Sequence, residues 1–134
     1  MKTKVCYCDT TLDFAACCQP YLDGQAEAPT AAALMRSRYS AFVTENLAYL
    51  KYSWYPADCP ADLKLDPCQW IGLKILDHGE YEPSKSAWVH FVARYKVGGK
   101  AHRIEERSLF SASNGRWYYR HPDHPDDPDQ RQEN

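Results

Sequence analysis

The sequence predicts an α+β fold in which helices precede an antiparallel sheet and a cysteine cluster precedes both. Three observations support this prediction. An alanine-rich segment has apolar residues at helical spacing, the second half alternates apolar and polar residues as strands do, and four of the six cysteines lie in the first eighteen positions. Helices followed by a run of strands are typical of α+β domains, and 134 residues suit a single domain.

Two helices are expected before the sheet. The first covers 30–43, where Pro29 marks the entry and alanines favour helix. Its apolar residues recur at i, i+4, i+7 and i+8 and should face the core: Met35, Tyr39, Phe42 and Val43. A shorter helix is expected at 45–53, with Thr44 as its N-cap and Pro56 beyond its end.

Four antiparallel strands are expected in the second half, at 70–77, 87–97, 100–111 and 116–120. Gly98-Gly99 is a two-residue hairpin turn that needs positive φ at both positions. Residues that face each other across this turn have numbers that sum to 197 (98 plus 99). The expected pairs are Val89 with Ser108, Phe91 with Glu106, and Ala93 with Ile104.

Charge and hydropathy argue against nucleic acid and membrane as partners. The formal net charge is −2, which gives no overall basic surface for nucleic acid. No segment is long and apolar enough to span a membrane, and no apolar run follows Lys2 and Lys4 to act as a secretory signal. We therefore expect a cytoplasmic protein. The segment 121–134 is acidic and proline-rich without aliphatic residues, so we expect it to be disordered.

The cysteine cluster predicts a metal site. Cys6 and Cys8 are separated by one residue, and the adjacent pair Cys17-Cys18 follows after eight more. Thiols crowded together in a reducing compartment are typical of a structural zinc ion, because four thiolates fill the coordination sphere and leave no position for water. The alternative is a set of unpaired thiols around a core. Cys59 and Cys68 do not repeat this pairing, so we interpret them as packing or exposed thiols; the alternative is a second zinc site with His78.

The chain also resembles the bacterial YchJ-like proteins, whose cysteine module is the SEC-C motif, a zinc knuckle also found at the C-terminus of the SecA translocation ATPase. The resemblance begins at the Cys-x-Cys and Cys-Cys pairs and extends almost to Arg120. The matching segments are Tyr21-Leu22-Asp23-Gly24, 33–43, Trp54-Tyr55-Pro56, Trp70-Ile71-Gly72-Leu73, 89–95, 106–110 and 115–119.

This resemblance implies a fold like that of nuclear transport factor 2, in which a strongly curved antiparallel sheet wraps around the helices. We therefore expect a knuckle at 1–24, a cone-shaped α+β domain at 25–120 and a tail at 121–134. The chain departs from the family at Tyr7, where proline is usual, and at Asp9-Thr10-Thr11, where Gly-Ser-Gly is usual. It also lacks the second knuckle with which some relatives end.

Glu106 is the anomaly of the predicted sheet, because it lies among the apolar residues of one face. Two interpretations remain open. In the first, Glu106 forms a buried ion pair with Arg36 or Arg38 of the first helix. In the second, Glu106 lines a pocket with Tyr39 and His102 that binds or processes a small molecule.

The function predicted from these features is a non-catalytic binding or adaptor role for the zinc knuckle. Aromatic residues surround the cysteines at Tyr7, Phe14 and Tyr21, and the similar knuckle of SecA is a docking surface, so we expect a protein partner. The sequence contains no nucleophile elbow, phosphate loop or metal-hydrolase motif. The alternative is a small-molecule binding protein or an enzyme that uses the concave face of the sheet.

Overall fold

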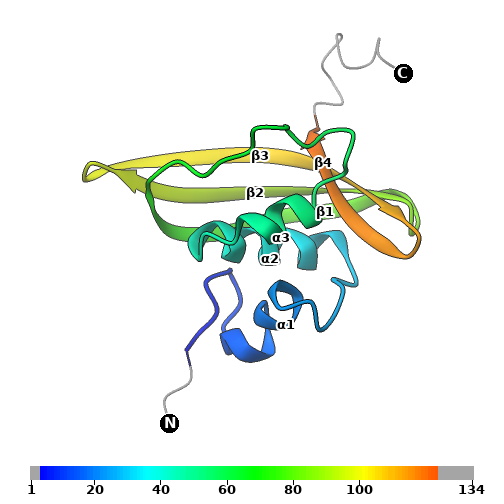
Figure 1. Cartoon of the computed structure of the whole chain (residues 1–134), viewed down its shortest axis with the longest axis horizontal. Helices are drawn as coiled ribbons and strands as arrows, with labels where there is room; N and C mark the ends of the chain where they lie inside the picture. Colours follow the sequence, from blue (N-terminus) through cyan, green and yellow to red (C-terminus); the bar gives the residue numbers. More distant parts are fainter. Residues whose placement is uncertain (1–3, 124–134) are drawn as a thin grey trace.

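The computed structural model describes residues 4–123, and Figure 1 shows the order of its elements. The helical elements are η1 (Phe14–Ala16), α1 (Gln19–Leu22), α2 (Ala31–Val43) and α3 (Leu47–Tyr52). The strands are β1 (Gln69–Glu82), β2 (Ser86–Val97), β3 (Lys100–Ser113) and β4 (Arg116–Pro122). They form one antiparallel sheet in the order β1-β2-β3-β4, which confirms the predicted α+β class.

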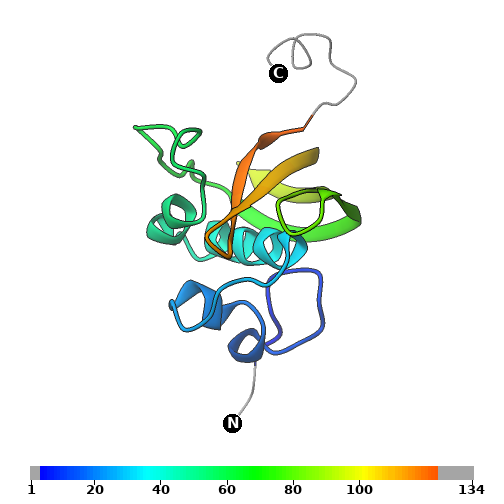
Figure 2. The same cartoon turned by 90° about the vertical axis from the view of Figure 1, so that its right-hand side faces the viewer.

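Helix α2 lies in the middle of the molecule. The N-terminal segment lies on one side of it and the sheet on the other, as Figure 2 shows from the end of the sheet. Thr30 caps the helix by accepting a hydrogen bond from the Ala33 N–H at 3.0 Å. Nine of its 13 residues are buried. This exceeds the expected stripe, because the second face of the helix is covered by the cysteine segment.

Helix α3 begins later than predicted. Asn46, not Thr44, is its N-cap, and the Asn46 side chain accepts a hydrogen bond from the Tyr49 N–H at 3.0 Å. Glu45 has φ of 56° and so separates the two helices. The Thr44 hydroxyl instead donates to the Ser40 carbonyl at 2.8 Å, at the end of α2.

The predicted register of β2 and β3 is confirmed. Gly98 and Gly99 both have positive φ, 58° and 81°. The register pairs Phe91 with Glu106 and also contains the other two expected pairs. The two-residue turn therefore predicted which residues of β2 and β3 face each other.

Strand β1 is longer than predicted and is irregular. It continues to Glu82, and its pairing with β2 shifts register at three places, which leaves Ile71, Leu76 and Tyr81 unpaired. Bulges of this kind bend a strand and increase its twist. They contribute to the curvature with which the sheet wraps around α2 (Figure 1).

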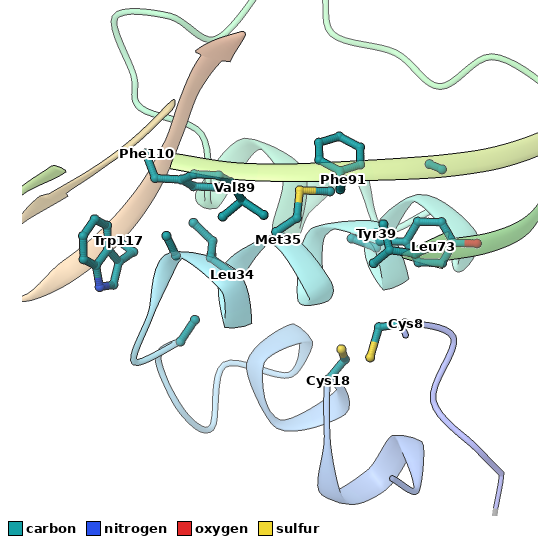
Figure 3. Packing of buried hydrophobic residues seen from close by; sticks show 14 of the residues in the cluster. Cys8, Cys18, Leu34, Met35, Tyr39, Leu73, Val89, Phe91, Phe110 and Trp117 are labelled. Atoms are coloured by element: carbon teal, nitrogen blue, oxygen red, sulfur yellow. The ribbon is translucent and has the colours of Figure 1, made fainter. Parts of the chain in front are cut away.

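The core lies between α2, α3 and the concave face of the sheet. Phe110, Leu50 and Val89 are fully buried there. Figure 3 shows Leu34, Met35 and Tyr39 of α2 pointing toward sheet residues, with Cys8 and Cys18 on the opposite side of the helix. The cysteine segment is therefore continuous with the hydrophobic core, and its buried cysteines belong to the same cluster.

The C-terminal boundary differs from the prediction. Strand β4 includes His121 and Pro122, and Asp123 is buried, with 6% of its surface exposed. The Asp123 carboxylate accepts hydrogen bonds from Tyr81 Oη at 2.5 Å and Arg107 Nε at 3.2 Å. The predicted tail therefore does not begin at residue 121; its remainder, 124–134, lies outside the described residues. Within the described part of the chain, no helix is long and apolar enough to cross a membrane.

Candidate metal centre

A short hairpin positions the first two cysteines. Its two arms are joined by hydrogen bonds from the Cys6 N–H to the Leu12 carbonyl at 2.8 Å and from the Phe14 N–H to the Lys4 carbonyl at 2.7 Å. Cys6 lies on the first arm of this hairpin, and Cys8 lies in the bend that follows it. Both are buried, with 5% and 7% of their surface exposed.

The adjacent cysteines lie where the chain turns between two short helical elements. Cys17 follows η1, with φ of −113° and ψ of −91°, and Cys18 is the N-cap residue of α1. A turn at this point is what two neighbouring cysteines require if both are to face one ion. Figure 3 shows Cys8 and Cys18 lying close together below α2.

The four sulfurs converge. All four lie within 4.8 Å of one another, with Cys8 Sγ 3.7 Å from Cys17 Sγ and Cys17 Sγ 4.0 Å from Cys18 Sγ. Thiolates placed about 2.3 Å from one ion at the corners of a tetrahedron lie about 3.8 Å from each other. The cluster therefore fits a single tetrahedral metal ion, and all six cysteines of the chain are free of disulfides.

Neighbouring thiols shift each other's protonation. A hydrogen bond with Cys18 lowers the pKa of Cys8 to about 5. Burial raises the pKa of Cys17 to about 11, and the bond with Cys8 together with burial raises the pKa of Cys18. Without an ion, Cys17 and Cys18 are protonated at neutral pH, so metal binding must displace their protons.

Hydroxyl groups surround the sulfurs. Thr10 Oγ1 lies 3.2 Å from Cys8 Sγ and 3.3 Å from Cys17 Sγ, and Ser40 Oγ of α2 lies 3.7 Å from Cys6 Sγ. Hydrogen bonds of this kind orient metal ligands and adjust their basicity. The contacts of Thr10 and Ser40 with sulfur were not predicted from the sequence. For Thr10, the departure from the family pattern at 9–11 was the one available indication.

Asp9 was also not identified from the sequence. Its carboxylate accepts hydrogen bonds from Arg36 Nε at 2.7 Å and from the Ile75 backbone N–H at 2.9 Å. The loop that carries Cys8 is therefore attached to both α2 and β1.

The structure does not contain the predicted ion pair of Glu106. Arg36 bonds Asp9, whereas Arg38 donates to the Leu50 carbonyl at 3.0 Å and to Ser53 Oγ at 2.7 Å. The reason is geometric: residues two apart on a helix point to different sides, so one arginine faces the cysteine segment and the other faces α3.

Glu106 instead accepts hydrogen bonds from hydroxyl groups. Its Oε2 atom is bonded by Ser108 Oγ and by Tyr119 Oη, the latter at 3.2 Å. The carboxylate is half-buried rather than enclosed. Two neutral hydroxyl donors and partial access to water therefore stabilise the Glu106 carboxylate in place of the expected arginine.

Tyr39 and His102 are not brought together with Glu106 in one pocket. Tyr39 is buried against Trp70, with ring centroids 5.8 Å apart, and burial raises its pKa to about 12. His102 is exposed and stacks on Tyr95 at 5.2 Å. A groove of about 590 Å³ does lie nearby, but neither Glu106, Tyr39 nor His102 lines it; its walls include Phe42, Leu65, Trp70, Tyr95, Val97 and Ile104.

Within residues 4–123, the four N-terminal cysteines are the only group of three or more potential metal ligands that converge. Cys68 lines the groove, and Cys59 donates to the Pro60 carbonyl at 3.7 Å. The second site considered for Cys59, Cys68 and His78 is therefore not formed.

Comparison with known proteins identifies the family. A family model described as the YchJ middle NTF2-like domain matches residues 30–122. The chain belongs to the YchJ-like family. This result confirms the resemblance noted in the sequence and agrees with helices packed on a curved four-stranded sheet.

Two bacterial relatives are named as UPF0225 proteins. A UPF0225 protein of Ralstonia nicotianae is 42% identical over 130 residues, which cover 87% of this chain and 89% of the relative. A UPF0225 protein of Cupriavidus pinatubonensis is 46% identical over 106 residues, which cover 78% of this chain and 73% of the relative.

Two solved structures share the fold. The solution structure of a SEC-C motif containing protein from Rhodopseudomonas palustris has a TM-score of 0.79 at 28% identity, over 92% of this chain and 100% of the other. The crystal structure of a SEC-C motif containing protein from Psychrobacter arcticus has a TM-score of 0.72 at 30% identity, over 94% and 82%. The cysteine cluster of this YchJ-like chain accordingly has the position expected of a SEC-C knuckle.

Proposed function

We propose that Cys6, Cys8, Cys17 and Cys18 hold one structural zinc ion, and that the knuckle so formed is a non-catalytic docking surface for a partner protein. The convergence of four sulfurs within 4.8 Å carries the proposal. Four thiolates complete the tetrahedral coordination of zinc and leave no position for a reactive water, which favours a structural ion over a catalytic one. Free cysteines are typical of a reducing compartment, which supports the cytoplasm as the place of action.

The exposed side of the hairpin supports a docking role. Val5 and Leu12 have 58% and 55% of their surface exposed on the arms that hold Cys6 and Cys8. Beside them, the Tyr7 ring packs against Phe14 with centroids 5.2 Å apart. Aliphatic and aromatic side chains on a rigid support suit the burial of an apolar segment of a partner protein.

The metal is tested by elemental analysis of protein purified without chelators. We expect one zinc per chain in the wild type and loss of the metal in Cys17→Ser. Cobalt substitution provides a second readout, because the visible spectrum of cobalt distinguishes a tetrahedral thiolate site from weaker surface binding. A wild type that is folded and free of metal would overturn the proposal.

The docking surface is tested by quantitative crosslinking in native lysate, comparing the double variant Val5→Asp/Leu12→Asp with the wild type. The matched control is Ile71→Asp/Leu76→Asp, because these aliphatic side chains are similarly exposed, at 43% and 45%, but lie on β1. We expect the hairpin variant alone to lose specific crosslinks. Equal losses in the two variants would contradict a specific role for the hairpin.

A second candidate function is supported by the groove beside Trp70. Its volume of about 590 Å³ is in the range of small-molecule sites, and its aromatic walls suit a flat apolar ligand. An apolar dye titrated against Trp fluorescence tests this possibility, with Ile104→Glu as the variant expected to abolish binding. Unchanged dye binding in Ile104→Glu would exclude the groove.

A further inference from the structure

Asp9 connects the cysteine cluster to two distant elements of the domain. It follows Cys8 directly, and each of its carboxylate oxygens has a separate partner. Oδ1 accepts from Arg36 Nε of α2 at 2.7 Å, and Oδ2 accepts from the Ile75 N–H of β1 at 2.9 Å. The side chains of Asp9 and Arg36 are 17% and 28% exposed, so the ion pair is largely shielded from water.

The bond to Ile75 fixes the cysteine loop to the edge of the sheet. Strand β1 is an outer strand, and its inner side is occupied by pairing with β2. The Asp9 carboxylate takes an N–H that would otherwise be left to solvent at this edge. The Asp9 side chain thereby contacts α2 at a residue 27 positions away in sequence and β1 at a residue 66 positions away.

The same loop also fixes the sulfurs. Thr10, next to Asp9, places its hydroxyl 3.2 Å from Cys8 Sγ and 3.3 Å from Cys17 Sγ. Asp9 therefore lies between a metal ligand and a residue that contacts two ligands. A displacement of its carboxylate would displace both.

We propose that Asp9 is a positioning residue that couples metal binding in the knuckle to the stability of the α2–β1 region, through Arg36 and Ile75. This inference rests on the proposed metal site. Metal that orders the cysteine loop strengthens the contacts of Asp9, and those contacts in turn hold Cys8 and Thr10 in place for metal. Because such coupling is reciprocal, loss of the ion pair must weaken metal binding by the same free energy by which it reduces the metal-dependent stabilisation of the domain.

The chain provides a convenient reporter for this coupling. All four tryptophans lie outside the knuckle, at Trp54, Trp70, Trp88 and Trp117. Thermal unfolding followed by Trp fluorescence therefore measures the domain and not the knuckle itself. The difference in Tm between zinc-loaded and chelator-treated full-length protein measures how much metal stabilises the domain.

The experiment compares the wild type with Asp9→Asn, Arg36→Gln, the double variant and the control Asp23→Asn. The control removes one negative charge from the exposed end of α1, where Asp23 forms no ion pair within the described residues. We expect Asp9→Asn and Arg36→Gln each to reduce the metal-dependent Tm difference and to weaken zinc affinity about 10- to 100-fold in chelator competition. The double variant should lose no more zinc affinity than the single variant with the larger loss, because both changes break the same ion pair.

A purely structural role gives a different result. If Asp9→Asn lowers Tm equally with and without zinc and leaves zinc affinity unchanged, the coupling is absent and the proposal fails. Losses that add in the double variant also contradict it. A wild type that binds no zinc instead overturns the proposed function, so the two failures are distinguishable.

Discussion

The guanidinium of Arg38 lies 4.6 Å from the centroid of the Tyr119 ring. On another side it lies 4.9 Å from the ring of Trp54. Arg38 is 3% exposed and has no carboxylate within hydrogen-bonding distance in the described structure. A buried cation is therefore held by two aromatic faces, a carbonyl and a hydroxyl, and burial lowers its pKa to about 10, so it stays charged at neutral pH.

Removal of Arg38 should destabilise the domain strongly. Arg38→Ala leaves a cavity and deprives the Leu50 carbonyl and the Ser53 hydroxyl of their donor. We expect a loss of about 2–5 kcal/mol in the free energy of unfolding, measured by urea denaturation with Trp fluorescence. Arg94→Ala is the control, because Arg94 is exposed and should change stability by less than about 0.5 kcal/mol. Similar losses in the two variants would show that Arg38 has no special role.

Replacement of Glu106 distinguishes the observed contacts from an ion pair. The amide oxygen of Glu106→Gln can still accept from Ser108 and Tyr119, so we expect a loss below about 1 kcal/mol in urea denaturation. Glu106→Ala leaves the fully buried Ser108 hydroxyl without this acceptor and should cost about 1–3 kcal/mol. Breaking a buried ion pair would cost about 3–5 kcal/mol, so a loss of that size in Glu106→Gln would indicate an arginine partner.

The elements that could be predicted from the sequence are those fixed by short-range rules. The Gly98-Gly99 turn determines the register of β2 and β3, and the N-cap and alanines of 30–43 determine α2. Side-chain partners could not be predicted in the same way. The long side chain of an arginine can reach several acceptors, and nothing in the sequence around Asp9 indicates that it accepts a hydrogen bond from Arg36.

In the candidate site too, the ligands could be predicted from the sequence but their side-chain partners could not. Cysteine number and spacing predicted a convergent cluster, because a tetrahedral ion requires four ligands whatever the surrounding fold. Ser40 could not be assigned, because its contact with Cys6 depends on how the hairpin packs on α2. Thr10 could not be assigned, because its contact with Cys17 depends on how the hairpin packs against the turn at residues 17 and 18. Long-range packing also explains why Asp123 belongs to the domain although its neighbours in sequence are polar.

Metal affinity should increase with pH. Burial raises the pKa of Cys17 to about 11, and hydrogen bonding with burial also raises the pKa of Cys18, so both are thiols at neutral pH and must lose protons to bind an ion. The proton competes with the metal, and its competition falls as pH rises. We expect the apparent zinc affinity to rise steadily from pH 6 to pH 8 in chelator competition. Calorimetry in two buffers of different ionisation enthalpy should show at least two protons released per zinc at pH 7; release of none would contradict the protonated state of this pair.

The end of the domain should depend on Asp123 and not on the residues after it. Its buried carboxylate accepts from Tyr81 Oη at 2.5 Å and from Arg107 Nε at 3.2 Å, and its backbone N–H donates to the Arg107 carbonyl at 2.6 Å. Asp123→Ala removes the acceptor of two polar side chains and should cost about 1–3 kcal/mol in urea denaturation. Deletion of 124–134 keeps these contacts and should change stability by less than about 0.5 kcal/mol. If the deletion costs as much as Asp123→Ala, residues beyond Asp123 contribute to the fold and the boundary lies further along the chain.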